Sequence, residues 1–359
     1  MSSNNLKPLF KYPGGKGSEL KHLKKLFPDF ETYIEPFLGG GAIFWATVAK
    51  KWVINDCSEE LVLVYTYSQQ QDSLFIEYIK DIGKIWQEKN AHMLDIIPLL
   101  HIDSNVDEEM FSEKISNTLL SYVSTLPKDE PLLATFIAKG IKRKKKSLAK
   151  ISETTEIKNW DENALGAIGT GVYTYIRYLY NQTDIKELPQ LKAALYLFLR
   201  EYAYSSMFRY NFDGDFNVPF GGNSYAKKDF FNRVNQITNN AVVNKLRNTI
   251  ILQGDFADAF VDEDSAFMFL DPPYDSEFST YNLQVFDAKE QIRLRDSLRK
   301  ITKTKWLMVV KSTEFIEELY EQDGWYKSRF DKSYSVNFKN RNDQEVKHLI
   351  ITNYQLGIL

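Results

Sequence analysis

Short apolar runs at the two ends of the chain predict the buried strands of a sheet. Runs of about four to eight apolar residues bounded by turn residues are typical of strands covered on both faces. The predicted strands are a short one starting at residue 32 and those at 52–56, 248–252, 266–270, 305–310 and 348–352. Helical patterns at 18–26, with Ser18 as the expected cap, 288–301 and 314–320 alternate with these strands, as in an α/β fold.

The middle of the chain has a different pattern. Apolar residues recur there at the three- and four-residue spacing of amphipathic helices, over 61–82, 111–126, 132–150, 172–180 and 191–204. This block breaks the alternation of strands and helices. We therefore expect a helical insert at 58–204 and an α/β domain formed by 1–57 together with 205–359.

One buried strand ends in residues suited to chemistry on an amine. The run at 266–270 leads into Asp271-Pro272-Pro273-Tyr274, and α/β folds build their sites at the carboxyl ends of strands. The exocyclic amine of adenine is a weak nucleophile, and the Asp271 carboxylate and the Pro272 carbonyl can each accept one of its N–H bonds. The prolines fix the backbone, and the Tyr274 ring offers a face for stacking a base. The alternative is a strand end in a proline turn with a core tyrosine.

A glycine loop after the first strand has the arrangement of a nucleoside-cofactor site. Glu35-Pro36-Phe37-Leu38-Gly39-Gly40-Gly41 leads into a helix, and the following strand ends in Asp56. Glycines let a ligand approach the backbone, and the acid can accept hydrogen bonds from ribose hydroxyls. The loop lacks the GxGxxG spacing and the chain has no GxxxxGK[ST] motif, which favours a cofactor without a pyrophosphate. S-adenosylmethionine fits this description.

Three further segments carry candidate binding residues. The turn-rich stretch Lys11-Tyr12-Pro13-Gly14-Gly15-Lys16-Gly17 supplies glycines and lysines that can clamp a carboxylate or phosphate. Residues 208–222 predict a hairpin around an Asp213-Gly214 turn, which either presents side chains to base edges or is a surface hairpin whose asparagines serve turns. A basic run at 139–150 either follows a phosphate backbone or forms a solvated helix face.

Composition narrows the classes of protein. The chain has 359 residues, of which 43% are hydrophobic, enough for a large core. Its polar start and the lack of a membrane-length apolar stretch predict a cytoplasmic protein without a signal peptide and with no membrane partner. One cysteine, Cys57, and scattered histidines exclude an internal disulfide and predict no metal site. The net charge of −3 argues mildly against a polyanionic partner, whereas the basic run argues for one.

Four segments in this order resemble a known family. They are Lys11 to Lys16, Glu35 to Phe44, Arg209 to Gly221 and Asp271 to Tyr274, and together they resemble the Dam-type DNA N6-adenine methyltransferases of the D12 class, α-order. The resemblance implies an α/β fold with a doubly wound, mostly parallel, Rossmann-like sheet of seven strands and an inserted, largely helical target-recognition domain. It also implies methyl transfer from S-adenosylmethionine to N6 of an adenine flipped out of double-stranded DNA.

The resemblance assigns roles to individual residues. Tyr12 and Lys16 would contact the cofactor, with Lys16 near its methionine carboxylate, Asp56 would hold the ribose, and Phe256 would pack near the adenine ring. The flipped base would stack on Tyr274. The predicted set comprises catalytic Asp271, Pro272, Pro273 and Tyr274; cofactor-binding Tyr12, Lys16, Glu35, Phe37, Gly39, Gly41, Asp56, Asp255, Phe256 and Asp271; and DNA-binding Arg209, Tyr210, Asn211, Asn217, Pro219, Lys142, Arg143, Lys144 and Lys145.

Three departures distinguish the chain from family members that modify GATC. Phe198 to Met207 lacks their Leu-Asn-Arg pattern, Asp213 replaces a basic residue, and the helical insert is long. These features resemble methylases that accompany type IIS restriction enzymes such as FokI. We therefore expect a bacterial or phage protein that acts at the nucleoid and is a monomer or a weak dimer. We also expect a cognate restriction endonuclease that acts separately. The alternatives are N4-cytosine methylation, for which Ser is usual in place of Asp271, methylation of RNA or of a protein glutamine, and a non-catalytic DNA-binding protein.

Overall fold

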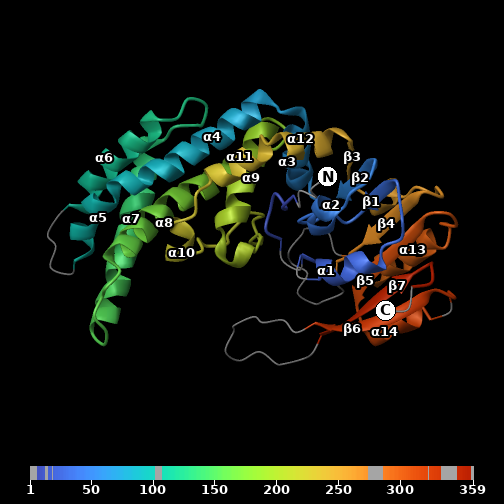
Figure 1. Ribbon diagram of the computed structural model, residues 1–359. Coiled ribbons are helices and arrows are strands. Elements are labelled where there is room, and N and C mark those ends of the chain that lie inside the picture. Colours follow the sequence, from blue (N-terminus) through green and yellow to red (C-terminus); the bar gives the residue numbers. More distant parts are fainter. Residues whose placement is uncertain are drawn as a thin grey trace. The chain divides into compact units, whose positions relative to one another are not determined.

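The computed structural model describes residues 6–12, 15–17, 19–101, 107–273, 286–321, 323–332 and 346–356. The chain forms two compact units (Figure 1). The sheet unit comprises Met1–Pro8, Gly14–Val62 and Lys245–Leu359, and the helical unit comprises Leu9–Pro13 and Leu63–Asn244. Helices α3 (Glu59–Gln70) and α12 (Asn240–Arg247) contain the two points at which the long segments divide.

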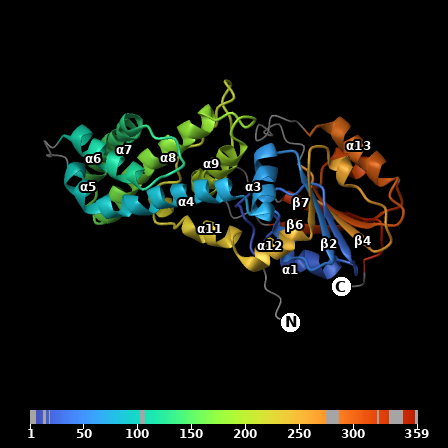
Figure 2. The ribbon, with the colours of Figure 1, turned by 90° about the horizontal axis from the view of Figure 1, so that it is seen from above.

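The sheet unit is built on one mixed sheet. Its strands within the described ranges are β1 (Thr32–Glu35), β2 (Lys51–Asp56), β3 (Thr249–Gln253), β4 (Ala266–Leu270), β5 (Lys305–Lys311), β6 (Tyr326–Lys332) and β7 (Val346–Thr352). These seven strands follow the spatial order β3-β2-β1-β4-β5-β7-β6 (Figure 1), and Figure 2 shows the same ribbon from above. The strands from β3 to β5 are parallel, and β7 runs antiparallel to both β5 and β6. The predicted doubly wound, mostly parallel α/β sheet is confirmed.

The strand order brings the carboxyl ends of three parallel strands together. β1 pairs with β2 on one side and with β4 on the other, and all three are parallel, so their carboxyl ends meet. The chain order reverses between β1 and β4, which is the switch point where open α/β sheets bind ligands. Glu35, Asp56 and Asp271 therefore belong to the same edge of the sheet.

The sheet is held by an apolar core. All five residues of β4 are buried, and the core includes Ile34 of β1, Met268 and Leu270 of β4, and Trp306 of β5. Short helical segments complete the unit: α1 (Leu20–Leu23), a 3-10 turn at Lys24–Leu26, α2 (Ala42–Ala46), a 3-10 turn at Phe256–Ala259, α13 (Ala288–Leu298) and α14 (Glu314–Leu319). The helix predicted at 18–26 is thus shorter, and its predicted cap, Ser18, lies outside the described residues.

The helical unit confirms the prediction of a largely helical insert. Its elements are α4 (Ser73–Glu88), a 3-10 turn at Lys89–His92, α5 (Met93–Leu100), α6 (Glu108–Ser121), α7 (Glu130–Ser152), α8 (Trp160–Gln182), α9 (Pro189–Tyr202), a 3-10 turn at Tyr204–Ser206, α10 (Asn223–Ala226) and α11 (Phe231–Ile237). Aspartates accept backbone N–H bonds at the starts of α4, α6 and α7. Helices α7 and α8 pack closely because glycines face the partner backbone: a Cβ on Gly140 would lie 2.5 Å from the Ala167 carbonyl oxygen.

The hairpin at 208–222 belongs to the helical unit, whereas the sequence analysis groups it with the catalytic domain. The Tyr173 hydroxyl of α8 donates to the Val218 carbonyl at 2.9 Å, and Asn181 of α8 exchanges hydrogen bonds with the backbone of Phe216. The Phe208 and Phe216 rings stack at 4.2 Å. Because α8 supplies these bonds, the compact units divide at 244/245 rather than at 204/205. No helix in the described ranges is both long and apolar enough to cross a membrane.

Candidate active site

The glycine loop after β1 is fixed by the acid at the end of β2. The Gly39 N–H donates to one oxygen of the Asp56 carboxylate at 2.8 Å, and the Ser58 N–H donates to the other at 2.9 Å. Gly39 and Gly41 have φ angles of 48° and 65°, in the left-handed region that favours glycine. Asp56 therefore shapes the loop directly, and its expected contact with a ribose stays a prediction.

Asn55 is a site residue that the sequence analysis missed. Its side chain is 1% exposed, and its amide nitrogen donates to the carbonyl of Pro36 at 3.0 Å and to that of Gly254 at 3.2 Å. The two loops that follow β1 and β3 are thus tied together across the end of β2. The signal in the sequence was a polar amide immediately before the predicted acid of a buried strand.

Three predicted cofactor residues are brought together with one that was not predicted. The rings of Phe37 and Phe256 lie 5.3 Å apart, and the guanidinium of Arg293 from α13 lies 4.2 Å from the Phe256 ring centre. Arg293 also donates to both oxygens of Asp255, at 2.9 and 2.7 Å. These hydrogen bonds lower the pKa of the Asp255 carboxyl below its usual value. The arrangement offers an aromatic platform that is braced by an ion pair.

The end of β4 carries an ion pair with the N-terminal glycine segment. The Lys16 amine lies 2.6 and 2.7 Å from the two carboxylate oxygens of Asp271, and the lysine is 2% exposed. Pro272 is buried and Pro273 is exposed. Tyr274, Pro13 and Gly14 lie outside the described residues. The structure thus joins Lys16 to Asp271, and a contact of Lys16 with a cofactor carboxylate stays a prediction.

Glu35 is the most perturbed acid of the site. It is 3% exposed and accepts a hydrogen bond from the Tyr33 hydroxyl at 2.8 Å. Burial, and to a smaller extent the negative charge of Asp271, raise the pKa of Glu35 to about 8, against the lowering effects of Tyr33, the Phe44 backbone and Lys245. A buried carboxyl with this pKa is mostly protonated at neutral pH, so it can serve as a hydrogen-bond donor.

Lys245 is a buried lysine whose amine binds the end of the helix that follows the same loop. It donates to the carbonyls of Phe44 and Thr47 at the end of α2, each at 2.6 Å. Its amine also lies 4.6 Å from the centre of the Trp52 ring. Burial lowers the pKa of Lys245 to about 7. This lysine fixes the helix that follows the glycine loop.

The predicted DNA-binding residues of the hairpin fall into two groups. Arg209, Asn217 and Pro219 are exposed. Tyr210 and Asn211 support the hairpin instead: the hydroxyls of Tyr210 and Tyr180 lie 2.9 Å apart, and the Asn211 side-chain oxygen accepts backbone N–H bonds from residues 213 and 215. The predicted turn is present, with Gly214 at a φ of 82°. Phe212, which is not among the predicted residues, lies at the tip of the hairpin and is fully exposed.

Three lysines of the basic run on α7 have polar partners within the helical unit. Lys142 lies 3.0 Å from Glu109, and Lys145 lies 3.7 Å from Glu108. Lys144 donates to the Asn223 side chain at 2.9 Å, and burial lowers the pKa of its amine. Arg143 is exposed. Lys142 and Lys145 are therefore balanced by acids of α6, and the DNA-binding role of this run stays a prediction.

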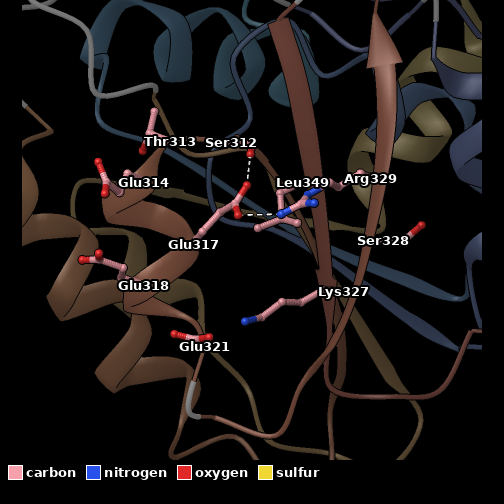
Figure 3. Close-up of a pocket in the computed structure, with 10 residues that line it drawn as sticks. All are labelled: Ser312, Thr313, Glu314, Glu317, Glu318, Glu321, Lys327, Ser328, Arg329 and Leu349. Atoms are coloured by element: carbon pink, nitrogen blue, oxygen red, sulfur yellow. Dashed lines mark hydrogen bonds and ion pairs between the residues drawn. The ribbon is translucent and has the colours of Figure 1, made fainter.

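A cavity of about 730 Å³ in the sheet unit lies apart from the predicted residues (Figure 3). Residues of α14, β6 and β7 and the segment after β5 line it, with Glu317 bound by the Ser312 hydroxyl and by Arg329. None of its lining residues is a predicted site residue. Among the described residues, no cluster of three or more His, Cys, Asp or Glu could hold a metal ion.

Comparison with known proteins agrees with this geometry. The family model described as D12 class N6 adenine-specific DNA methyltransferase matches residues 12–94 and 139–333. The type II methyltransferase M.CviBI of Paramecium bursaria Chlorella virus NC1A is 28% identical over 357 residues, covering 97% of this chain and 100% of that protein. The type II methyltransferase M.MjaIII of Methanocaldococcus jannaschii is 26% identical, covering 97% and 99%. The DNA adenine methylase of Escherichia coli K12 is 20% identical, covering 80% and 73%.

Proposed function

Because the chain belongs to the D12 class of N6-adenine-specific DNA methyltransferases, we propose that it methylates N6 of an adenine flipped out of double-stranded DNA, using S-adenosylmethionine. The observation that carries the proposal is the meeting of three carboxyl strand ends, with the glycine loop after β1, Asp56 at the end of β2 and Asp271 after β4. This is the edge at which an α/β sheet holds a nucleoside cofactor beside its substrate.

The chain's own residues suit that cofactor. The positive φ angles of Gly39 and Gly41 bring backbone, without side chains, to the end of β1. The Phe37 and Phe256 rings offer an apolar surface for an adenine, and Asp56 offers carboxylate oxygens beside the loop. When bound, the cofactor supplies an electrophilic methyl group.

Asp271 and the Pro272 carbonyl orient the target amine. Each accepts one N–H bond of adenine N6, which favours a more pyramidal and more nucleophilic nitrogen. Lys16, 2.6 Å from Asp271, holds the carboxylate in place. The nitrogen loses a proton after methylation, when it is cationic and acidic, so no covalent enzyme intermediate is required. Most of the rate enhancement comes from alignment of the reacting atoms.

We further propose that the helical unit reads the DNA target. The exposed Arg209, Asn217 and Pro219 of its hairpin have side chains and positions suited to base edges and phosphates. The names of the viral and archaeal relatives, both type II methyltransferases, support a role in a restriction-modification system.

The proposal is tested by Asp271→Ala with transfer of a radiolabelled methyl group to DNA. We expect loss of methyl transfer and retention of DNA affinity, since Asp271 acts on the amine and not on the DNA backbone. Asp264→Ala is the matched control, because Asp264 is an exposed acid just before the other end of β4. Near-normal turnover by Asp271→Ala would contradict the mechanism. Digestion of the product to nucleosides distinguishes N6-methyladenine from N4-methylcytosine.

A further inference from the structure

Arg200 lies at the end of α9, in the segment that departs from the GATC-modifying pattern, and its surroundings are unusual. It is 3% exposed, and its guanidinium carbon lies 4.4 Å from the centre of the Tyr12 ring. It also donates to the Lys11 carbonyl at 3.4 Å. We propose that Arg200 is a positioning residue that holds Tyr12 in place to contact S-adenosylmethionine; the proposal rests on the function proposed above.

The guanidinium has aromatic neighbours where a buried cation usually has an acid. Its carbon lies 5.0 Å from the Phe208 ring centre and 5.8 Å from that of Tyr196. In the described part of the chain no carboxylate forms an ion pair with Arg200, and its Nε has no hydrogen-bond partner there. A planar guanidinium stacks on rings in a way that lysine cannot. Desolvating a cation without an anion costs stability, so the arrangement is poorly explained by stability alone.

Glu201, next to Arg200 in the chain, also contacts the residue before Tyr12. Its carboxylate forms an ion pair with Arg233 at 2.8 Å and lies 3.8 Å from the amine of Lys11. Phe10, which is 4% exposed, packs against Tyr65 and Tyr196. The two residues that precede Tyr12 are thus held within the helical unit.

Tyr12 itself is only half-buried. Its Arg200 contact restricts the ring, and restricting a binding side chain before the ligand arrives lowers the entropy cost of binding. Arg200 therefore acts on the cofactor through Tyr12 and makes no contact with the reacting atoms.

The test is a double-mutant cycle with steady-state kinetics. Arg200→Met should raise KM for S-adenosylmethionine roughly ten-fold, the size expected for one cation–π contact and one hydrogen bond. KM for DNA and the melting temperature should change little. Arg200→Lys should restore only part of the loss. Because Arg200 acts through Tyr12, Arg200→Met in a Tyr12→Leu background should add less than a two-fold change.

Lys192→Met is the matched control on the same helix. The Lys192 amine lies 3.7 Å from the Tyr180 ring centre, so this variant also removes a cation from an aromatic ring of the unit. Its KM for S-adenosylmethionine should equal that of the wild type. Multiplying effects in the double variant, or equal rises in both KM values with a fall in melting temperature, would overturn the assignment of Arg200.

Calorimetric titration of the wild type with S-adenosylmethionine distinguishes a failure of the proposed function from a failure of the Arg200 assignment. A wild type that neither binds the cofactor nor methylates DNA overturns the proposed function and the assignment of Arg200 with it. A wild type that does both, with an unaltered Arg200→Met variant, overturns only the assignment of Arg200.

Discussion

Replacing Glu35 with Gln should make the sheet unit more stable at neutral pH. The side chain is buried beneath the glycine loop and accepts a hydrogen bond from Tyr33, which a Gln oxygen can also accept. Burial raises the pKa of Glu35 from 4.5 to about 8. Gln removes the titration without changing the size of the side chain, so any change in pH dependence reports the carboxyl itself.

The sign and size of the effect follow from proton linkage. Below pH 4.5 Glu35 is protonated in the folded and unfolded states and contributes no pH dependence. Between pH 4.5 and about 8 the unfolded chain releases the proton and the folded chain keeps it, so the free energy of unfolding falls as pH rises. At 1.36 kcal/mol per pH unit, the loss reaches about 3 kcal/mol at pH 7. Lys245, whose pKa is lowered to about 7, begins to oppose this trend only above that pH.

Urea unfolding of wild type and Glu35→Gln at pH 5 and pH 7 measures the effect. The advantage of the variant should widen by about 2.5 kcal/mol between the two pH values, because a small part of the loss is already present at pH 5. Hydrogen-exchange protection of the β1 amides provides a second readout that reports the sheet unit alone. Glu31→Gln, an exposed acid just before β1, should run parallel to the wild type. An advantage that is the same at both pH values would refute the reasoning.

Two further predictions concern DNA and the loop. Phe212→Ala should weaken DNA binding about ten-fold in fluorescence anisotropy, since stacking of one base on an aromatic ring is worth roughly 1–3 kcal/mol. The control Val48→Ala, also at an exposed apolar residue, should leave DNA affinity unchanged. Equal affinities of the Phe212 variant and the wild type would exclude a role for the tip of the hairpin. Gly41→Ala should lower the free energy of unfolding, measured by thermal unfolding, by about 1–2 kcal/mol, because Gly41 has a φ of 65°. The control Gly17→Ala should change it little, because no atom lies within 4 Å of the added Cβ.

The sequence predicted the strands better than the helices. Each predicted strand is present, and β4 has the predicted bounds, because buried parallel strands are continuous apolar runs. β6 was missed: Tyr326–Lys332, at the edge of the sheet, has only two aromatic residues among polar and charged ones, so it contains no apolar run. The helix predicted at 61–82 is two helices, because Gln71 has a φ of 51° and Asp72 caps α4.

The sequence identified site residues singly but not their partners. Lys16 and Asp271 were both predicted, yet their ion pair joins positions 255 residues apart, which no local pattern reveals. Arg293 was overlooked because it lies on an ordinary amphipathic helix, and only the fold brings it to Asp255. The raised pKa of Glu35 also depends on burial, which the loop sequence does not indicate.

The division of the chain into two units determines which residues have to be exchanged together in a chimaera. Residues Leu63–Asn244 carry the hairpin and the helices in one continuous stretch, so a single genetic exchange can replace them without touching a strand of the sheet. The short segment Leu9–Pro13 also belongs to the helical unit, and Arg200 and Glu201 contact it. A chimaera that imports a new recognition stretch therefore has to import the matching residues 9–13 as well. The helical unit, which we propose reads the target, thereby constrains a motif that lies far upstream in the gene.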